Sequence, residues 1–352
     1  ANKHRVSKTT GNSFIASGYA DIKLFPDLTL TINGNAYDYD RRGLYTEDPY
    51  TDKYTSGSNN GYLSKSSSRT FTYNAQQLLN YHKVIDNTHD ISVMLGHEYY
   101  NYLYEYMGAS GYNFGIDGAT ELAQVLNKNG DPYSYSNAYN NEGYFFRGMY
   151  SYDNKYFGSL SFRRDASSRF HKDYRWGNFW SVGASWRLSQ EKFMEQFSSW
   201  LSNLTVKVSY GVQGNDNLGT YYAWQGLYDY TWANGSEAGA FASKLENKAI
   251  TWEKNGNLNA GIEASLFGGK VTFTAEYYNR HTRDMLLENP LAISTGFTGY
   301  DANVGSMRNQ GFEFSGRVNI IDMPNFRWDA NAMASLNRNK VTSLTYSQDF
   351  IS

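Results

Sequence analysis

The feature that most constrains this sequence is a strict alternation of apolar and polar residues over positions 28–40, LTLTINGNAYDYD. Alternate positions hold Leu28, Leu30 and Ile32, and the intervening positions hold threonine, asparagine and tyrosine. A period of two places successive side chains on opposite faces of a β-strand. One face of the strand is therefore apolar and the other is polar. Such a strand suits a soluble sheet with one wet face, or a membrane barrel with a wet interior.

The same pattern returns along most of the 352 residues. It precedes residue 28 in residues 14–22, and the link LFPD joins the two runs as a hairpin. We expect about twelve strands of about 9 to 15 residues, where a tilted membrane strand needs about 9 to 11. The other expected strands lie at about residues 70–82, 90–104, 142–152, 156–165, 178–188, 204–212, 257–267, 270–280, 308–319 and 326–337.

Charged residues within the expected strands fall on the polar face. Lys207, Glu276 and Arg317 are examples. A charge that faces lipid at the bilayer midplane costs about 2–4 kcal/mol, whereas one that faces a lumen costs little. Gln77 and His97 break this pattern, because both fall on the apolar face. We expect them to lie near a membrane interface, unless the strand register there is shifted by one residue.

The connections between the expected strands alternate in length. The short links are residues 24–27, 83–89, 153–155, 268–269 and 320–325, and the long ones are residues 41–69, 105–141, 166–177, 213–256 and 281–307. Outer-membrane barrels have short turns on the periplasmic side and long loops outside, and a soluble sandwich has no reason to sort its loops in this way. The sequence therefore predicts an all-β fold, a transmembrane antiparallel β-barrel.

One connection on the short side is longer than the rest. Residues 189–203 place Phe193, Met194, Phe197, Trp200 and Leu201 at helical spacing after a serine, which predicts one short amphipathic helix under the barrel rim, with a role at the membrane surface as the alternative. Aromatic residues gather at strand ends, where they are expected to form belts at the membrane interfaces. These residues are Tyr99, Tyr100, Tyr102, Tyr104, Tyr106, Trp176, Phe179, Trp180, Tyr277 and Tyr278.

Composition excludes several other classes of protein. No apolar run approaches the roughly 18–20 residues of a membrane helix, and the mean hydropathy of −0.64 is compatible with a barrel whose lumen and loops are polar. A net charge of −2 gives no basis for binding nucleic acid. The first ten residues contain no apolar signal-peptide core, so either a leader has been removed or the chain begins inside a longer protein.

Signatures of catalysis or of a metal site are also missing from the sequence. There are no cysteines, and the 6 histidines are scattered without metal-ligand spacing. The acidic loop residues Glu47, Asp48 and Asp52 lack the spacing of a calcium loop. No nucleophile elbow or phosphate-binding loop is present. We therefore expect no enzyme activity, no metal and no cofactor.

Five segments that follow one another in order are more specific than the strand pattern. They are SFRRDASSRF with WGNFWSVGASWRLSQEKFM, LTVKVSYGVQGN, WEKNGNLNAGIEASLFGGKVTFTAEYYNRHTRDMLL, NVGSMRNQGFEF, and the earlier YNAQQLLNYHKVIDNTHDISVMLGHEYY. Together they resemble the SusC/RagA family of TonB-linked outer-membrane transporters, chiefly over residues 161–341 with an upstream hairpin at residues 73–100.

The resemblance implies a barrel of about 22 strands with a plugged lumen. It also implies the outer membrane of a Gram-negative, Bacteroidota-like cell, a SusD-like surface lipoprotein as partner, energy supplied through TonB, and oligosaccharides or peptides as cargo. No plug domain, TonB-contact box or terminal aromatic strand is recognisable. We therefore expect residues 1–352 to be the middle part of the barrel, with the plug and the final strands absent from this chain.

Aromatic residues in the long loops are the candidate contacts with substrate or with the lipoprotein, because flat rings can stack on sugar faces. They are Tyr133, Tyr135, Tyr139, Tyr221, Tyr222, Trp224, Tyr228, Tyr230 and Trp232. The alternative is that these rings only pack loop on loop. Two other functions stay open from the sequence: a passive porin, and a β-rich surface adhesin.

Overall fold

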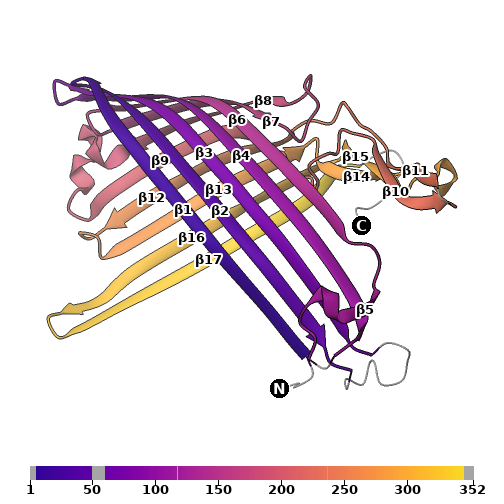
Figure 1. Cartoon of the computed structure of the whole chain (residues 1–352). Coiled ribbons are helices and arrows are strands. Elements are labelled where there is room, and N and C mark those ends of the chain that lie inside the picture. Colours follow the sequence, from indigo (N-terminus) through magenta and orange to yellow (C-terminus); the bar gives the residue numbers. More distant parts are fainter. Residues whose placement is uncertain (1–4, 50–59, 117, 236, 345–352) are drawn as a thin grey trace. The chain divides into compact units, whose positions relative to one another are not determined.

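The structure is a computed structural model that describes residues 5–49, 60–116, 118–235 and 237–344 (Figure 1). The chain forms two compact units. Unit 1 holds residues 1–20, 32–76 and 98–141, and unit 2 holds residues 21–31, 77–97 and 142–352. The helices of the described residues are all too short or too polar to cross a membrane.

Five strands contribute residues to both units and are much longer than the sequence predicts. They are β1 (Arg5–Phe25), β2 (Leu28–Glu47), β3 (Tyr62–Ile85), β4 (His89–Phe114) and β6 (Tyr133–Tyr152). Strands therefore extend into both ends of the expected long loops at residues 41–69 and 105–141. The apolar signal fails there because both faces of a segment such as SKSSSRT, residues 64–70, are polar.

The remaining strands of the large sheet belong to unit 2. They are β7 (Tyr156–Ser167), β8 (Trp176–Arg187), β9 (Leu201–Asn215), β12 (Glu253–Leu266), β13 (Val271–Arg283), β16 (Ser306–Met323) and β17 (Phe326–Ser343). Twelve strands follow one another in the sheet in chain order, from β1 to β17, and the short β5 (Val125–Lys128) pairs with β4 (Figure 1). This confirms the predicted antiparallel barrel segment of about twelve strands.

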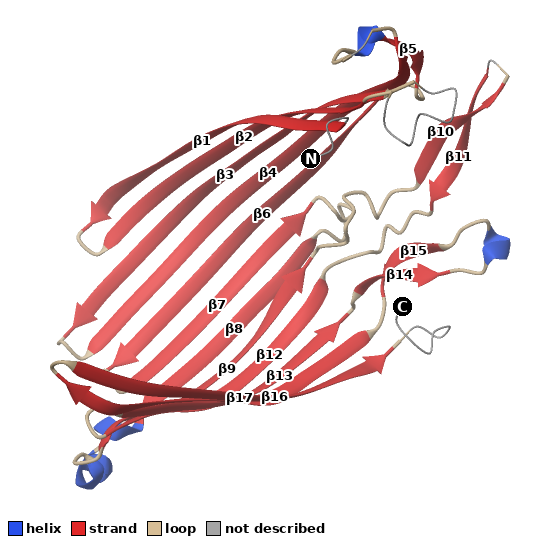
Figure 2. Cartoon of the chain, turned by 90° about the horizontal axis from the view of Figure 1, so that it is seen from below, coloured by secondary structure: helices blue, strands red, loops and turns tan. Residues whose placement is uncertain are grey.

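Two small hairpins stand outside the large sheet (Figure 2). β10 (Leu227–Asn234) pairs with β11 (Glu237–Lys244), and β14 (Leu286–Pro290) pairs with β15 (Gly299–Asn303). Both lie within connections that the sequence predicts as long loops. The short 3₁₀ turns η1 (Leu122–Gln124) and η4 (Ile293–Thr295) also lie in such connections.

The register in unit 2 assembles one apolar face, which we call the outer face, and one polar face, the inner face. On the outer face Val208 pairs with Ala184 and with Ala260. On the inner face Lys207 pairs with Gly261 and its Nζ lies 3.1 Å from Oε2 of Glu276. Val208 is 47% exposed. A soluble sandwich would bury such a face under a second layer of structure, so the exposed apolar face fits contact with lipid.

Tyr278 is not part of an aromatic belt, because its ring covers a glycine on the inner face. Tyr278 is only 7% exposed and pairs with Gly311 of β16. A Cβ at Gly311 would lie 2.0 Å from the Leu336 carbonyl oxygen and 2.7 Å from Tyr278 Oη. By contrast, a Cβ at Gly316 on the same strand would have its nearest neighbour at 3.9 Å. Gly311 is therefore required by close packing.

The helix predicted over residues 189–203 is wrong. The segment forms two 3₁₀ turns, η2 (Leu188–Gln190) and η3 (Lys192–Phe197), and β9 already begins at Leu201 (Figure 2, blue). Glu191 lies between the turns and accepts hydrogen bonds from Tyr156 Oη and from Trp186 Nε1. These bonds lower the pKa of the Glu191 carboxyl below its usual value. Hydrogen bonds to aromatic side chains at the strand ends thus hold the link at residues 188–200 in place, and no apolar helix face is involved.

Candidate functional site

Six tyrosines of unit 1 form cross-strand ring pairs between β4 and β6, which we call the tyrosine wall. They are Tyr100, Tyr104 and Tyr106 of β4 and Tyr133, Tyr135 and Tyr139 of β6. The last three belong to the predicted site, but they lie on a strand rather than in a loop. β-pairing with β4 fixes their spacing, because alternate residues of a strand share a face.

The rings of the tyrosine wall are close enough to contact one another. Tyr106 lies 5.5 Å from Tyr133 and 5.3 Å from Tyr135, measured between ring centroids. Tyr133 Oη donates a hydrogen bond of 3.3 Å to Tyr106 Oη. Even so, Tyr133 is 59% exposed and Tyr135 is 49% exposed. The wall therefore presents ring edges, ring faces and hydroxyl groups to solvent.

The site predicted from the sequence includes no residue of β4. Tyr104 and Tyr106 are predicted there as members of a membrane belt, yet their rings pack against Tyr135 at 5.9 Å and 5.3 Å. The period-two pattern could have distinguished Tyr104 and Tyr106 from Tyr99, which lies on the opposite face of β4 and contacts Tyr73 of β3 at 5.8 Å. The available signal was thus whether a residue occupies an odd or an even position along the strand.

The second group of predicted residues lies in unit 2, and three of its members follow β9 in a braced loop. Trp224 packs edge-on against the His171 ring at 5.2 Å and against the buried cluster of this loop. The Arg169 guanidinium lies 5.1 Å above the Tyr221 ring, and the rings of Tyr221 and Tyr222 are 6.3 Å apart. These rings thus pack within the loops themselves, which was the alternative to contact with substrate or with the lipoprotein.

The other three predicted residues, Tyr228, Tyr230 and Trp232, belong to the hairpin strand β10. Tyr228 is 61% exposed and Tyr230 is 71% exposed. In the ladder Trp232 pairs with Gly239 of β11. This hairpin therefore keeps two tyrosine rings free to meet a ligand or a partner.

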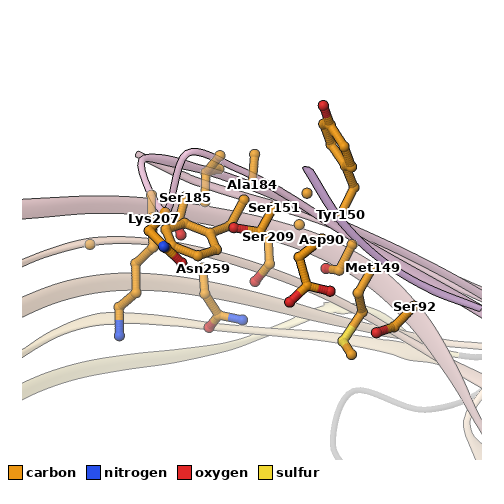
Figure 3. Close-up of a pocket in the computed structure, with 18 of the residues that line it drawn as sticks. Asp90, Ser92, Met149, Tyr150, Ser151, Ala184, Ser185, Lys207, Ser209 and Asn259 are labelled. Carbon is orange, nitrogen blue, oxygen red and sulfur yellow. The ribbon is translucent and has the colours of Figure 1, made fainter. Parts of the chain in front are cut away.

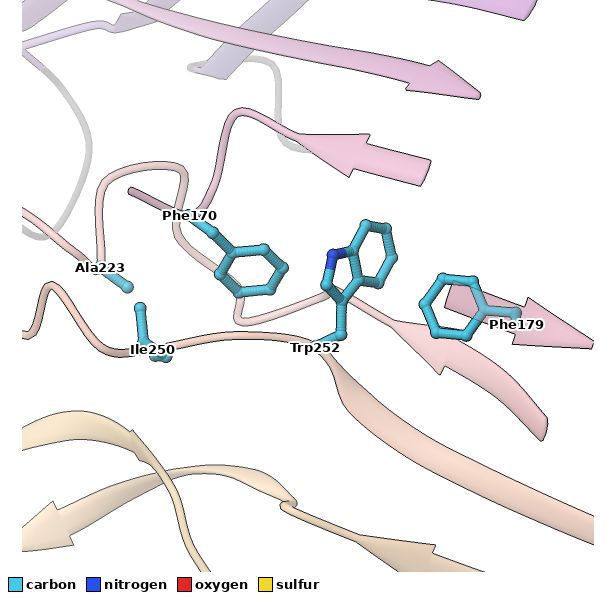
Figure 4. Packing of buried hydrophobic residues seen from close by; sticks show 5 residues of the cluster. All are labelled: Phe170, Phe179, Ala223, Ile250 and Trp252. Atoms are coloured by element: carbon cyan, nitrogen blue, oxygen red, sulfur yellow. The ribbon is translucent and has the colours of Figure 1, made fainter. Parts of the chain in front are cut away.

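A buried cluster holds the loops of unit 2 in place. Phe170 and Ile250 are fully buried, and Trp252 is 5% exposed. Figure 4 shows Trp252 flanked by Phe170 and Phe179, with ring centroids 5.5 Å and 5.2 Å from the Trp252 ring. Phe179 is therefore a core residue of the loops. The prediction from the sequence, that it belongs to an aromatic belt at the membrane interface, is wrong.

Polar contacts reinforce this cluster around the SFRRDASSRF segment. Ser167 Oγ donates a 2.7 Å hydrogen bond to Asp216 Oδ2, and Arg169 Nη1 donates a 3.0 Å bond to the Asp216 carbonyl oxygen. Trp252 Nε1 donates a 2.8 Å bond to the Arg175 carbonyl oxygen. The segment that carries the family resemblance is thus a structural brace.

The inner face of unit 2 contains a hollow of about 580 Å³. In Figure 3 Asp90, Lys207 and Asn259 point to one side of the sheet, whereas Tyr150 points to the other. The wall between them is built from short side chains, among them Ser209. These short residues leave room for another polypeptide or for water against the sheet.

Comparison with known proteins identifies the class to which this arrangement belongs. An uncovered apolar outer face, a polar inner face and braced loops at one end of the strands define an outer-membrane β-barrel wall. Residues 4–351 match the family described as TonB dependent receptor-like, beta-barrel. The chain therefore belongs to the TonB-dependent receptor β-barrel family, in the outer membrane.

The individual relatives are of the SusC/RagA type. A TonB-dependent receptor of Formosa agariphila is 29% identical over 94% of this chain and 32% of its own length. The TonB-dependent receptor SusC of Bacteroides thetaiotaomicron is 33% identical over 58% of this chain and 21% of its own length. The structure of the RagAB peptide transporter superposes with a TM-score of 0.91 at 29% identity, covering 98% of this chain and 38% of that chain. These matches confirm the resemblance, and the chain spans about a third of the length of the relatives it matches along most of its sequence.

Proposed function

We propose that this chain forms part of the wall of a TonB-dependent importer that carries oligosaccharides or peptides across the outer membrane. The matched family is one of receptors and transporters rather than enzymes, and it favours neither a passive porin nor an adhesin. The observation that carries the proposal is the tyrosine wall, in which Tyr133 and Tyr135 remain exposed while the sheet fixes the spacing of the rings.

The chemistry of the tyrosine wall suits either cargo. A phenol ring stacks on the apolar face of a sugar or packs against a peptide side chain, and its hydroxyl hydrogen-bonds sugar hydroxyls or peptide groups. Parity along β6 places Tyr135 and Tyr139 on the same face as Phe145, whose ring lies under the inner-face residue Arg163 at 5.0 Å. This parity supports the assignment of the wall to the inside of the barrel.

The remaining parts of an importer are proposed on the same basis. Within the part of the chain that the structure describes, β1 and β17 are the two ends of the strand order, and each pairs along one edge only. Because every backbone amide in lipid needs a partner, we propose that further strands close the barrel. A plug facing the hollow beside Lys207, a SusD-like lipoprotein above the loops, and coupling to TonB complete the proposal.

Uptake by the full-length transporter tests the role of the tyrosine wall. Cells that produce Tyr135→Ala or Tyr139→Ala should take up a fluorescent glucan oligosaccharide or fluorescent peptides of a protein digest about fivefold more slowly, since each stacking contact contributes about 1 kcal/mol. Whichever probe the natural protein carries is the informative one.

The matched control is Tyr144→Ala, on the same strand but on the outer face, where Tyr144 is 49% exposed. This variant should be made and inserted normally and should transport at the natural rate. Equal transport by the Tyr135, Tyr139 and Tyr144 variants would show that the wall does not contact cargo.

The hairpin residues give a second, independent measurement. Binding of the same probe should weaken in Tyr228→Ala or Trp232→Ala if β10 contacts cargo, and Trp224→Ala should act through the stability of its loop. A co-purification assay with the SusD-like lipoprotein separates a partner contact from a cargo contact, because only the former would reduce recovery of the lipoprotein.

A further inference from the structure

A row of polar side chains crosses the outer face of unit 2 over neighbouring strands. His97 Nδ1 lies 2.6 Å from Gln77 Oε1, and the His97 ring stacks on Tyr144 at 4.7 Å. The row continues to Arg164, which pairs with Asn178 of β8. Gln77 and His97 therefore contact one another on the outer face, and the alternative explanation, a register shifted by one residue, does not apply.

The residues on either side of this polar row differ sharply in character. Towards the turns, the next outer-face positions are Leu95, Phe146 and Phe162, all apolar. Together with Tyr144 and Trp176 they line a shallow hollow of about 650 Å³ whose one charged lining residue is Arg164. The hollow is apolar at its base and cationic at its rim.

The position of Arg164 along β7 places it at a membrane boundary. Tyr156 lies beside Tyr152 and Trp186 in an aromatic cluster at the turn end of the strand, which marks the periplasmic boundary. Eight residues separate Tyr156 from Arg164, which is about 26 Å along a strand and about 20 Å along the membrane normal at the usual tilt. An apolar band is about 25 Å tall, so Arg164 lies near the outer-leaflet headgroups.

Arg164 has no carboxylate partner among the described residues. Its guanidinium lies 5.0 Å above the Trp176 ring, which orients it but leaves its N–H donors available. The nearby Glu142 is engaged elsewhere, because it accepts a 2.7 Å hydrogen bond from Tyr144 Oη and lies 3.4 Å from His97 Nε2. A positive charge at this depth is therefore presented to the membrane.

We propose that this hollow is a binding site for a phosphorylated outer-leaflet lipid. An acyl chain would lie on Leu95, Phe146 and Phe162, and the headgroup phosphate would accept hydrogen bonds from the Arg164 guanidinium. Trp176 orients the guanidinium by stacking beneath it. Charge complementarity and the depth of the site select this occupant over a neutral lipid.

The test is retention of bisphosphorylated lipid A by the full-length transporter in nanodiscs, counted by native mass spectrometry. Arg164→Gln should reduce retention about tenfold, since the lost interaction is a charged hydrogen bond. Arg164→Lys should retain most of the lipid A, because it keeps the positive charge. The natural protein should bind dephosphorylated lipid A no better than the Arg164→Gln variant binds the phosphorylated form.

Arg187→Gln is the matched control, because Arg187 also stacks on an aromatic ring, that of Phe157 at 5.4 Å, but on the inner face. Its lipid retention should equal that of the natural protein. Equal retention by Arg164→Gln and the natural protein would overturn the proposal. So would a change of oligomeric state in Arg164→Gln without any loss of lipid, because the hollow would then be covered by a second copy of the protein.

Discussion

Replacing Val208 with arginine tests the assignment of the outer face to lipid. Val208 is the central residue of β9, with seven residues of the strand on either side. Its cross-strand neighbours are Ala184 and Ala260, which offer no partner for a charge. Seven residues correspond to about 23 Å along the strand and about 18 Å along the membrane normal.

The free-energy cost follows from that depth. On the periplasmic side, Val206 pairs with the boundary residue Trp186, so Val208 lies about 5 Å inside that boundary along the membrane normal. An arginine side chain reaches about 6 Å and relieves part of the cost by extending towards this boundary. The expected destabilisation of the inserted state is about 1–2 kcal/mol, between the values for arginine at an interface and at the midplane of a membrane barrel. This corresponds to a loss of about 5-fold to 30-fold in the folding equilibrium.

The matched control is Ser209→Arg, one residue further along β9 on the inner face. Ser209 borders the hollow that already holds the Lys207–Glu276 ion pair, so an added guanidinium there stays hydrated. Folding of the full-length protein into lipid vesicles, followed against urea concentration by heat-modifiable gel mobility, measures both variants. If Val208→Arg folds as well as Ser209→Arg, the outer face is not in contact with hydrocarbon and the barrel assignment fails.

Three further perturbations test the packing of the chain. Gly311→Ala should destabilise the protein by about 1–3 kcal/mol in the same folding assay through overpacking, whereas Gly316→Ala should be nearly neutral; equal effects would contradict the close-packing argument. Phe170→Ala should cost about 3–5 kcal/mol of loop stability and speed hydrogen exchange around Trp252, and unchanged exchange would remove the buried cluster as the loop brace. The lowered pKa of Glu191 means that its hydrogen bonds stabilise the link above the usual glutamate pKa and are lost as pH falls through the lowered value. The protection of amides in residues 188–200, measured relative to the intrinsic exchange rate at each pH, should therefore fall on acidification in the natural protein and should already be low at neutral pH in Glu191→Gln. Protection that responds to neither change would refute this role.

The sequence was informative wherever hydrocarbon imposed a pattern. In the parts of β8, β9, β12 and β13 that border hydrocarbon every second residue is apolar, so the strands and their faces follow from a period of two. The same logic flagged Gln77 and His97 as exceptions, and the structure pairs the two side chains with one another. Where water borders both faces, as in residues 64–70, no such pattern exists and the strand was missed.

The sequence by itself determined the class of this protein: a strand that borders lipid must alternate, and alternation can be read along the chain. Only the tertiary structure decided which aromatic rings meet. Tyr135 joins the tyrosine wall because strand pairing brings β4 beside β6, Phe179 enters the loop core beside Trp252, and Tyr278 covers Gly311. These contacts join residues far apart in the chain, and local patterns carry no information about which distant side chain will fill a given space.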